Sequence, residues 1–405
     1  MSDMETREVK LGDIVKYNKG YAFKSSEYTD EGVMVVRVTD FTLDSISDVD
    51  AVYLAPDDRY DKFILKTNDI LIQTVGSWAN NPNSIVGKVV RVPNQCDSAY
   101  LNQNIVRIIP NNDFDNTYLF YALRANQFST YCVLRGQGAA NQASITLDTI
   151  FRFKFKVHNF AEQKRIADIL SAYDNLIENN NKRIRLLEQM AENLYKEWFV
   201  RFRFPGYEDV EIKNDIPKNW STRKLKDIVK KSGKFIKREN LTENLKYVPI
   251  DCIDSKTMVL LKNDDLENAS SSLQTFKTND ILFGAMRPYF HKVSLSHFDG
   301  VTRTTCFVIA PKKKEYKYFL YLLLFQEATV NFATTISVGS TMPYVRWEDF
   351  IRMNVVVPDI ETAKKFSMEI DPLMKVIQNL SEINKLLARQ RDLLLPRLMS
   401  GKLEV

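Results

Sequence analysis

Two long segments of the chain carry apolar side chains at alternating spacings of four and three residues. The first segment runs from Tyr173 to Trp198 and the second from Leu373 to Leu394, with a constant offset of 200 residues between matching positions. A heptad pattern of this kind is typical of coiled coils, whereas an amphipathic helix packed on its own domain tolerates a drifting 3.6-residue period. We therefore predict two long helices that pair with each other. The predicted seam consists of Tyr173, Ile177, Asn180, Ile184, Leu187, Leu194, Leu373, Ile377, Leu380, Asn384, Leu387 and Leu394.

Two asparagines interrupt this apolar seam. Asn180 lies in the first helix and Asn384 in the second, at different levels of the heptad repeat. A buried polar pair at a seam position can fix the register of two helices. Alternatively, each amide could face water, and the pattern by itself leaves both interpretations open.

Each long helix is preceded by the same order of shorter elements. Strand-like runs of β-branched residues come first, broken by Gly, Asn and Pro. An aromatic-rich amphipathic helix is predicted at about residues 117–134 and again at about 316–334. A short strand, Phe153–Val157 in one copy and Met353–Val357 in the other, then leads into the long helix. The strand-like runs of the first copy include residues 35–38, 70–72 and 89–92.

Short segments also recur in the same order along the chain. Lys10–Lys16 returns as Lys224–Lys230 with one substitution, and Lys66–Leu71 returns unchanged as Lys277–Leu282. The offset between matching segments decreases from 214 to 211 and then to 200 residues, as expected for two copies that differ in loop length. The chain is therefore expected to consist of two related halves.

The repeat predicts an α+β fold in which two pseudo-repeated α/β domains are joined by the two long helices. Because the second helix must return towards the first domain, the helices are expected to form an antiparallel coiled coil. The predicted boundaries are a first domain at 1–160, a helix at 161–203, a Pro-punctuated linker at 204–219, a second domain at 220–360 and a second helix at 361–405.

Composition and charge narrow the function without fixing it. The 405 residues are 44% apolar and 26% charged, with a formal net charge of +5. These values fit a folded multidomain protein and exclude disordered and collagen-like chains. The positive excess lies in the second half of the chain, and residues 1–61 are acidic. Uneven basic surface suits a polyanion such as nucleic acid, although a solvated face is the other ordinary explanation.

The sequence contains none of the common catalytic or metal-binding motifs. Its four cysteines form no C-x-x-C pair and its three histidines lack zinc-ligand spacing, so neither a disulfide framework nor a metal site is predicted. No phosphate-binding loop, dinucleotide-binding turn or nucleophile elbow is present. The segment Asn81-Pro82-Asn83-Ser84 does not match the Asn/Asp-Pro-Pro-aromatic motif of DNA methyltransferases. We expect a chain that performs no catalysis and binds no cofactor. Without an apolar signal core or a membrane-spanning stretch, a cytoplasmic location is expected.

Three segments resemble the specificity subunit of type I restriction-modification systems. Glu162–Leu170 is similar to that family's start of the central helix, and the connector from Phe204 to Trp220 is similar to its join into the second recognition domain. The C-terminal segment Leu394–Leu403 resembles its terminal motif. Together with the repeat, the resemblance covers essentially all 405 residues. One departure is Pro358–Lys365, which lacks the Glu-Gln pair at the equivalent helix start.

The resemblance implies a non-catalytic subunit of a DNA methyltransferase and endonuclease complex. Such a subunit recognises an asymmetric, bipartite site on double-stranded DNA, with one half-site for each target recognition domain. It holds two methyltransferase subunits and, in the full complex, the translocating restriction subunits. A helix from 161 to 200 would span about 60 Å, which is long enough to hold two domains over half-sites about 34 Å apart. A scaffold whose two globular domains bind proteins instead of DNA is the alternative function.

Base recognition needs forked or amide side chains on loops or ribbons. Two segments in each half supply side chains of this kind. In the first half they are the stretch after the Asn-Asp-Ile-Leu strand and a Gly-rich loop, and the second half has counterparts of both. Each candidate could equally be an exposed loop residue, and Trp78 and Tyr289 could stack on DNA or cap the core. The candidates are Ser77, Trp78, Asn80, Lys88, Arg135, Gln137, Asn141, Gln142, Arg287, Tyr289, His291, Lys292, Ser340, Thr341, Tyr344 and Arg346.

Overall fold

The computed structural model describes residues 6–42, 45–48, 50–78, 84–139, 142–242, 244–269 and 272–405. The chain forms two compact units. Residues 1–176 and 387–405 make up the first unit, and residues 177–386 make up the second. The boundaries fall inside the long helices, because each helix packs on the first unit with one part of its length and on the second with the other.

The first unit is built around a four-stranded antiparallel sheet with the order β2-β9-β5-β7. A second sheet has the order β4-β3-β8, and its β3 and β8 are parallel. The elements of this unit are β1 (Arg7–Lys10), α1 (Leu11–Ile14), β2 (Val15–Lys19), β3 (Val33–Val36), β4 (Val52–Leu54), β5 (Ile70–Gln73), β6 (Val75–Gly76), β7 (Val89–Arg91), β8 (Tyr100–Leu101), β9 (Ile105–Pro110), α2 (Asn116–Arg124), α3 (Asn126–Arg135), β10 (Gln137–Ala139), β11 (Gln142–Ser144), α4 (Leu147–Phe151), β12 (Lys154–Val157) and the beginning of α5 (Phe160–Tyr195).

The side chains of the central strand β5 are buried on both faces of this sheet. Successive side chains of a strand point to opposite faces, and Ile70, Leu71 and Ile72 are all fully buried. Ile70 and Ile72 belong to the core that includes Leu119 of α2. Leu71 belongs to a separate core that includes Val35 of β3. An uninterrupted apolar run such as Ile-Leu-Ile is what a strand buried on both sides requires.

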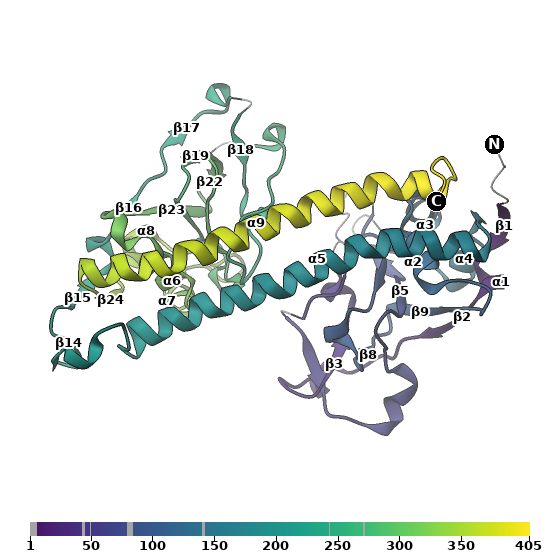
Figure 1. The fold of residues 1–405 in the computed structure, drawn as a ribbon, viewed down its shortest axis with the longest axis horizontal. Coiled ribbons are helices and arrows are strands. Elements are labelled where there is room, and N and C mark those ends of the chain that lie inside the picture. The colour runs from purple at the N-terminus through teal and green to yellow at the C-terminus, as the bar shows by residue number, and fades with distance from the viewer. Residues whose placement is uncertain are drawn as a thin grey trace. The chain divides into compact units, whose positions relative to one another are not determined.

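The second unit repeats this architecture. Its main sheet has the order β16-β23-β20-β21, and a second sheet has the order β17-β19-β22-β18, in which β18 and β22 are parallel (Figure 1). Its elements are β13 (Ile212–Lys213), β14 (Ile216–Pro217), β15 (Ser221–Lys224), β16 (Val229–Lys231), β17 (Phe235–Ile236), β18 (Lys246–Tyr247), β19 (Leu273–Phe276), β20 (Ile281–Gly284), β21 (Val293–Leu295), β22 (Gly300–Arg303), β23 (Cys306–Pro311), α6 (Lys317–Phe325), α7 (Glu327–Thr335), α8 (Trp347–Phe350), β24 (Asn354–Val357) and the beginning of α9 (Ile360–Met399).

Strand pairing confirms the internal repeat. In the first unit β1 pairs with β12 so that Lys10 lies opposite Lys154, and in the second β15 pairs with β24 so that Lys224 lies opposite Asn354. The strand that carries the repeated Asn-Asp-Ile-Leu motif is central in both main sheets, as β5 and as β20. The predicted α+β fold with two pseudo-repeated domains is therefore correct.

One detail of the predicted order of elements is wrong in both halves. The segments expected to be single helices are each two helices, α2 and α3 in the first unit and α6 and α7 in the second. The breaks lie at Ala125, with ψ of 144°, and at Gln326, with ψ of 142°. An extended residue ends the first helix and redirects the second. Neither break contains Pro or Gly, so the sequence offered no breaker signal.

The long helices run antiparallel within each unit, as predicted. In the second unit Asn180 of α5 contacts Asn384 of α9, and in the first unit Asp174 of α5 contacts Arg391 of α9. As residue numbers increase along α5, the residues of α9 that they contact have decreasing numbers. None of the twelve predicted seam residues is exposed, and Ile377 is fully buried.

The segment between the halves is more ordered than the predicted linker. It contains the hairpin β13–β14, in which Ile212 lies opposite Pro217. Phe204 and Trp220 are both buried, and their rings stack with centroids 5.1 Å apart. None of the helices in the described ranges is long and apolar enough to cross a membrane.

Candidate nucleic-acid interface

Each unit carries a small β-ribbon formed by two segments that are distant in sequence. In the first unit β10 and β11 form a hairpin, and β11 also pairs with β6, so that Ser144 lies between Gln137 and Val75. The Ile145 amide donates to the Thr74 carbonyl at 2.9 Å and closes the junction. The ribbon therefore joins the Gly-rich loop to the segment that follows the central strand β5.

The second unit has the same ribbon in reduced form. Tyr344 forms antiparallel bridges with Val338 on one side and with Met286 on the other. The Val345 amide donates to the Ala285 carbonyl at 2.9 Å, which matches the junction in the first unit at offsets of 200 and 211 residues. The two groups of loop segments that the sequence identified separately are thus brought together in both units.

Each ribbon contains a glycine with a positive φ. Gly138 has φ of +149° and Gly339 has φ of +106°, in the region of backbone conformation that L side chains rarely adopt. A Cβ atom on Gly138 would lie 2.0 Å from the Gln142 carbonyl oxygen. Only glycine lets the two strands of the first ribbon approach this closely.

The first ribbon presents polar side chains on one face. Opposite partners and residues two apart point to the same side of a strand pair, which places Gln137, Gln142 and Ser144 together. All three are exposed, whereas Ala143, on the other face, is fully buried against the core of the unit. Gln137 and Gln142 are predicted candidates, and Ser144 is a residue that the sequence analysis missed.

Two more predicted candidates flank this ribbon. Arg135 is exposed, with its guanidinium 4.1 Å from the centroid of the Tyr131 ring. Trp78 is half-buried and packs against the core, beside the backbone of Gly136. Ser77 is also half-buried, and its amide donates to the Ser84 carbonyl at 2.6 Å.

Three predicted candidates of the first unit do not contribute to the described surface. Lys88 is only 7% exposed, so its side chain is buried in the unit and is not presented on the surface. Asn80 and Asn141 lie outside the described residues.

The second ribbon presents a different set of side chains. Ser340, Thr341, Tyr344 and Arg346 are exposed. Arg287 is half-buried, and its Nη2 donates to the Thr341 carbonyl at 3.4 Å, which connects the turn after β20 to the ribbon loop. Three exposed apolar residues of this surface were not predicted, because the search was limited to polar and aromatic candidates with hydrogen-bonding groups. They are Phe290, Val338 and Met342.

His291 and Lys292 have their side chains directed into the protein. His291 is 3% exposed, and its Nε2 donates to the Phe325 carbonyl at 2.8 Å. Burial lowers the pKa of this imidazole, so the ring is neutral near pH 7. Lys292 Nζ donates to the Ile250 carbonyl at 2.9 Å. These contacts give both residues a role in holding the turn between β20 and β21.

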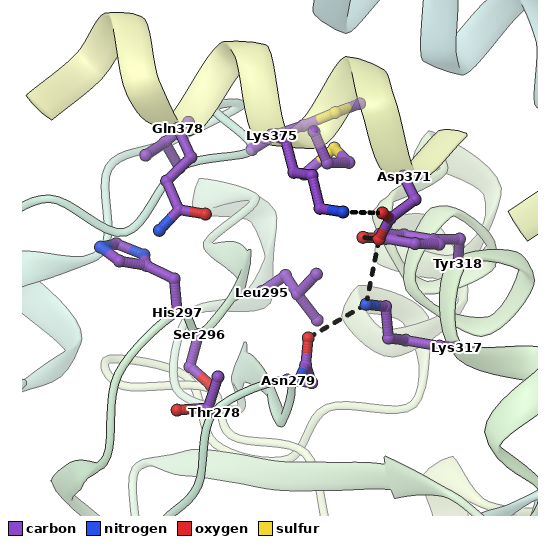
Figure 2. Close-up of a pocket in the computed structure, with 13 residues that line it drawn as sticks. Thr278, Asn279, Leu295, Ser296, His297, Lys317, Tyr318, Asp371, Lys375 and Gln378 are labelled. Carbon is purple, nitrogen blue, oxygen red and sulfur yellow. Dashed lines mark hydrogen bonds and ion pairs between the residues drawn. The ribbon is translucent and has the colours of Figure 1, made fainter. Parts of the chain in front are cut away.

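A cleft of about 260 Å³ in the second unit is lined by charged and polar side chains of α6 and α9 (Figure 2). Its central carboxylate, Asp371, accepts a hydrogen bond from the Tyr318 hydroxyl at 2.6 Å and pairs with Lys375 Nζ at 2.6 Å. Lys317 Nζ lies 3.7 Å from the same carboxylate and donates to Asn279 Oδ1 at 3.0 Å. The Lys375 and Tyr318 hydrogen bonds lower the pKa of Asp371. The charged groups therefore satisfy one another and tie α6 to the start of α9.

A cluster of lysines and arginines borders the second sheet of the second unit. Lys230, Lys231, Lys234, Lys237 and Arg238 are all exposed on or beside β16 and β17. Phe235, within this cluster, is 77% exposed. Flexible cations of this kind suit phosphate contacts, which position a nucleic acid without specifying its sequence.

The family model described as "Type I restriction modification DNA specificity domain" matches residues 1–189 and again residues 217–389. Two specificity subunits of type I restriction enzymes from Methanocaldococcus jannaschii are similar to this chain. The MjaIX subunit is 29% identical, over 75% of this chain and 73% of its own length. The MjaVIII subunit is 24% identical, over 98% of this chain and 92% of its own length.

A solved structure has the same fold. The type I restriction-modification S subunit from M. genitalium superposes with a TM-score of 0.55, covering 98% of this chain and 97% of that chain at 16% sequence identity.

Proposed function

Because the chain belongs to the family of type I restriction-modification specificity subunits, we propose that it reads a bipartite DNA sequence, with one half-site bound by each unit. Subunits of this family recognise DNA and perform no catalysis. In this proposal the chain supplies sequence recognition, and partner subunits supply methylation and cleavage.

The observation that supports this proposal is the repeated ribbon. Both units join the segment after the central strand to a glycine-containing loop, and both expose side chains on the resulting surface. The hairpin β10–β11 projects two of these strands, and a two-stranded ribbon is narrow enough to enter the major groove, where every base pair has a distinct pattern of donors and acceptors. Gln137 and Gln142 carry amides of the type that pair with adenine.

The two units present different side chains at equivalent places, which suits an asymmetric site. Position 142 is Gln and its counterpart 342 is Met, while position 144 is Ser and its counterpart 344 is Tyr. Identical ribbons would read two copies of one half-site. Recognition of two different half-sites requires different side chains on similar backbones.

We further propose that two methyltransferase subunits bind the related halves of the chain, and that restriction subunits join the full complex. A pseudo-repeated chain offers two similar surfaces to two copies of one partner. Several apolar side chains on the long helices are exposed to solvent, as expected for surfaces that a partner covers. They are Leu176, Leu186 and Met190 on α5, and Ile383, Leu386 and Leu393 on α9. The assembled enzyme would act in the cytoplasm, where four free thiols stay reduced.

Methylation mapping of DNA modified by the reconstituted complex tests the proposal. The chain is co-expressed with its methyltransferase subunit, and the modified adenines are located by methylation-aware sequencing. The expected result is one bipartite motif with a fixed spacer. Methylation without a bipartite motif would overturn the proposal.

Salt dependence separates DNA recognition from the scaffold alternative. A complex that neutralises several phosphates loses about 10³-fold or more in DNA affinity between 50 and 200 mM salt. A scaffold whose units bind proteins shows no such loss, because it has no DNA affinity to lose.

A further inference from the structure

At matching positions, the first ribbon carries polar side chains and the second carries apolar or aromatic side chains. Gln137, Gln142 and Ser144 form the exposed face of the first ribbon. At offsets of 200 or 201 residues, the second ribbon has Val338, Met342 and Tyr344, which are 49%, 59% and 44% exposed. The pairing of Gln137 with Ser144 has its counterpart in the bridge between Val338 and Tyr344, and at these places the side chains change from polar to apolar or aromatic.

A neighbouring turn extends this apolar surface. Tyr289 and Phe290 are 48% and 44% exposed, and their ring centroids lie 4.8 Å apart. The turn is fixed to the ribbon because the Arg287 amide donates to the Pro343 carbonyl at 2.7 Å. Five exposed apolar side chains therefore lie on two segments of the second unit that this hydrogen bond joins.

The turn that presents the two aromatic rings is held in a strained conformation. Arg287 and His291, on either side of residues 288–290, have φ of +48° and +50°, and a non-glycine residue in this region costs about 1 kcal/mol or more. Buried contacts hold it, including the His291 hydrogen bond to Phe325. Backbone strain that keeps aromatic side chains in water points to a partner surface.

Arginines beside the apolar surface indicate that this partner is DNA. Arg346 is exposed two residues after Tyr344, and the half-buried Arg287 lies beside the ribbon loop, where its Nη2 donates to the Thr341 carbonyl. Cationic groups at the edge of an apolar surface suit the phosphates that border a groove. In the major groove, the thymine 5-methyl is the one apolar group that a base edge offers.

We infer that the second unit reads its half-site through thymine 5-methyl groups packed on Tyr289, Phe290, Val338, Met342 and Tyr344, whereas the first unit reads through amide hydrogen bonds. This inference rests on the proposed function and adds the chemistry of each half-site.

Replacing thymine by deoxyuridine tests the inference, because it removes only the 5-methyl group. The probe is a duplex that carries the mapped bipartite site, and the protein is the complex with its methyltransferase subunits. The first unit's half-site is the one at which Gln142→Ala relaxes methylation specificity. Deoxyuridine in the other half-site is expected to weaken binding about fourfold for each methyl lost, from about 0.8 kcal/mol per buried methyl-sized group. Deoxyuridine in the first half-site should change binding less than twofold.

Variants connect the effect to the ribbon. Met342→Gln gives the second ribbon the residue type of the first at this position, and it should bind thymine and deoxyuridine duplexes with more nearly equal affinity. Phe290→Ser should do the same if Met342→Gln does not fold. Met368→Gln is the matched control, since Met368 is 68% exposed on α9, and it should keep the wild-type ratio.

The outcomes separate this inference from the proposed function. A bipartite methylation motif with no deoxyuridine effect, with equal effects at both half-sites, or with no thymine in the second half-site overturns the inference and leaves the proposed function standing. Absence of a bipartite motif overturns the proposed function itself.

Discussion

The side-chain amide of Asn180 donates to Asn384 Oδ1 at 2.8 Å, and this bond joins the two long helices in the second unit. Asn384 in turn donates to Asn181 Oδ1 at 2.8 Å. Asn180 is only 8% exposed, so its amide depends on this partner. The two asparagines occupy different heptad levels in their own helices, and antiparallel pairing is what brings them together.

Replacing one of these asparagines should destabilise the second unit. Asn180→Leu leaves the partly buried Asn384 amide without its donor, at a cost of about 1–3 kcal/mol. The double variant Asn180→Leu, Asn384→Leu removes both polar groups and should recover most of that loss. Denaturant unfolding of the two single variants and the double variant measures the coupling.

The exposed neighbour Asn179 provides the control, and Asn179→Leu is expected to change stability by less than about 0.5 kcal/mol. Equal losses in Asn179→Leu and Asn180→Leu, or fully additive losses in the double variant, would argue against a role for the pair in register.

A buried ion pair performs a similar task in the first unit. Arg391 is 2% exposed and its Nη1 lies 2.5 Å from Asp174 Oδ1, while Asp174 Oδ2 accepts a hydrogen bond from the Tyr121 hydroxyl. Arg391→Met removes the cation and leaves the Asp174 carboxylate, which is only 15% exposed, without its partner. This should destabilise the unit by about 3 kcal/mol.

Thermal unfolding checks this prediction, with Arg389→Met as the control because Arg389 is exposed on the same helix. The double variant Asp174→Leu, Arg391→Met should be more stable than Arg391→Met alone, since it leaves no unpaired charge. A double variant as unstable as the single one would contradict the argument.

Glu188 of α5 should make the stability of the second unit depend on pH. Burial raises the pKa of this carboxyl to about 7, although it accepts a hydrogen bond from the Met258 amide at 2.7 Å. Because the folded-state pKa lies above that of the unfolded chain, the stabilising contribution is complete below about pH 4.5 and is lost as the pH rises through 7.

Glu188→Gln keeps an acceptor for the Met258 amide and removes the charge. Its thermal midpoint should equal that of the wild type at pH 4 and exceed it by several degrees at pH 8, from about 2–4 °C per kcal/mol. The exposed Glu208 gives the control, and Glu208→Gln should follow the wild-type midpoint at both pH values. A Glu188→Gln profile parallel to the wild type would show that the carboxyl is not responsible.

Base contacts and phosphate contacts should be distinguishable by substitution. Gln142→Ala is expected to relax specificity at one base position of one half-site, at a cost of about 1–3 kcal/mol. Lys234→Ala should weaken binding to all sequences alike and reduce the slope of log affinity against log salt by about one. Binding titrations at several salt concentrations, on matched and mismatched duplexes, separate the two effects.

The same titrations show whether Arg135→Ala and Arg287→Ala remove a base contact or a phosphate contact. If either variant changes the salt slope and leaves specificity intact, that arginine contacts phosphate. Arg287→Ala also removes the contact with Thr341, so its thermal midpoint is measured alongside.

The sequence was sufficient to predict the repeat, the alternation of strand-rich domains with long helices, and the antiparallel helix pair. The heptad spacing and the recurring segments carry that information locally, because a seam must recur every seven residues and a buried strand such as β5 must be apolar along its whole length. The breaks at Ala125 and Gln326 could not be predicted, because neither residue is a helix breaker and only tertiary packing sets their ψ values.

The residues of the candidate surface could be predicted from the sequence only in part. The sequence identified Gln142 and Tyr344 as candidates on loops. The pairing of β11, which carries Gln142, with β6 at Val75 and the bridge from Tyr344 to Met286 placed each beside the segment after the central strand. It also directed His291 inward, since a ring nitrogen 2.8 Å from the Phe325 carbonyl is a contact between segments 34 residues apart. Periodicity reports which face of an element is apolar, whereas the partner of a polar side chain depends on long-range folding. For that reason Asn180 and Asn384 were visible as seam residues from the sequence, but only the folded chain showed that they bind each other.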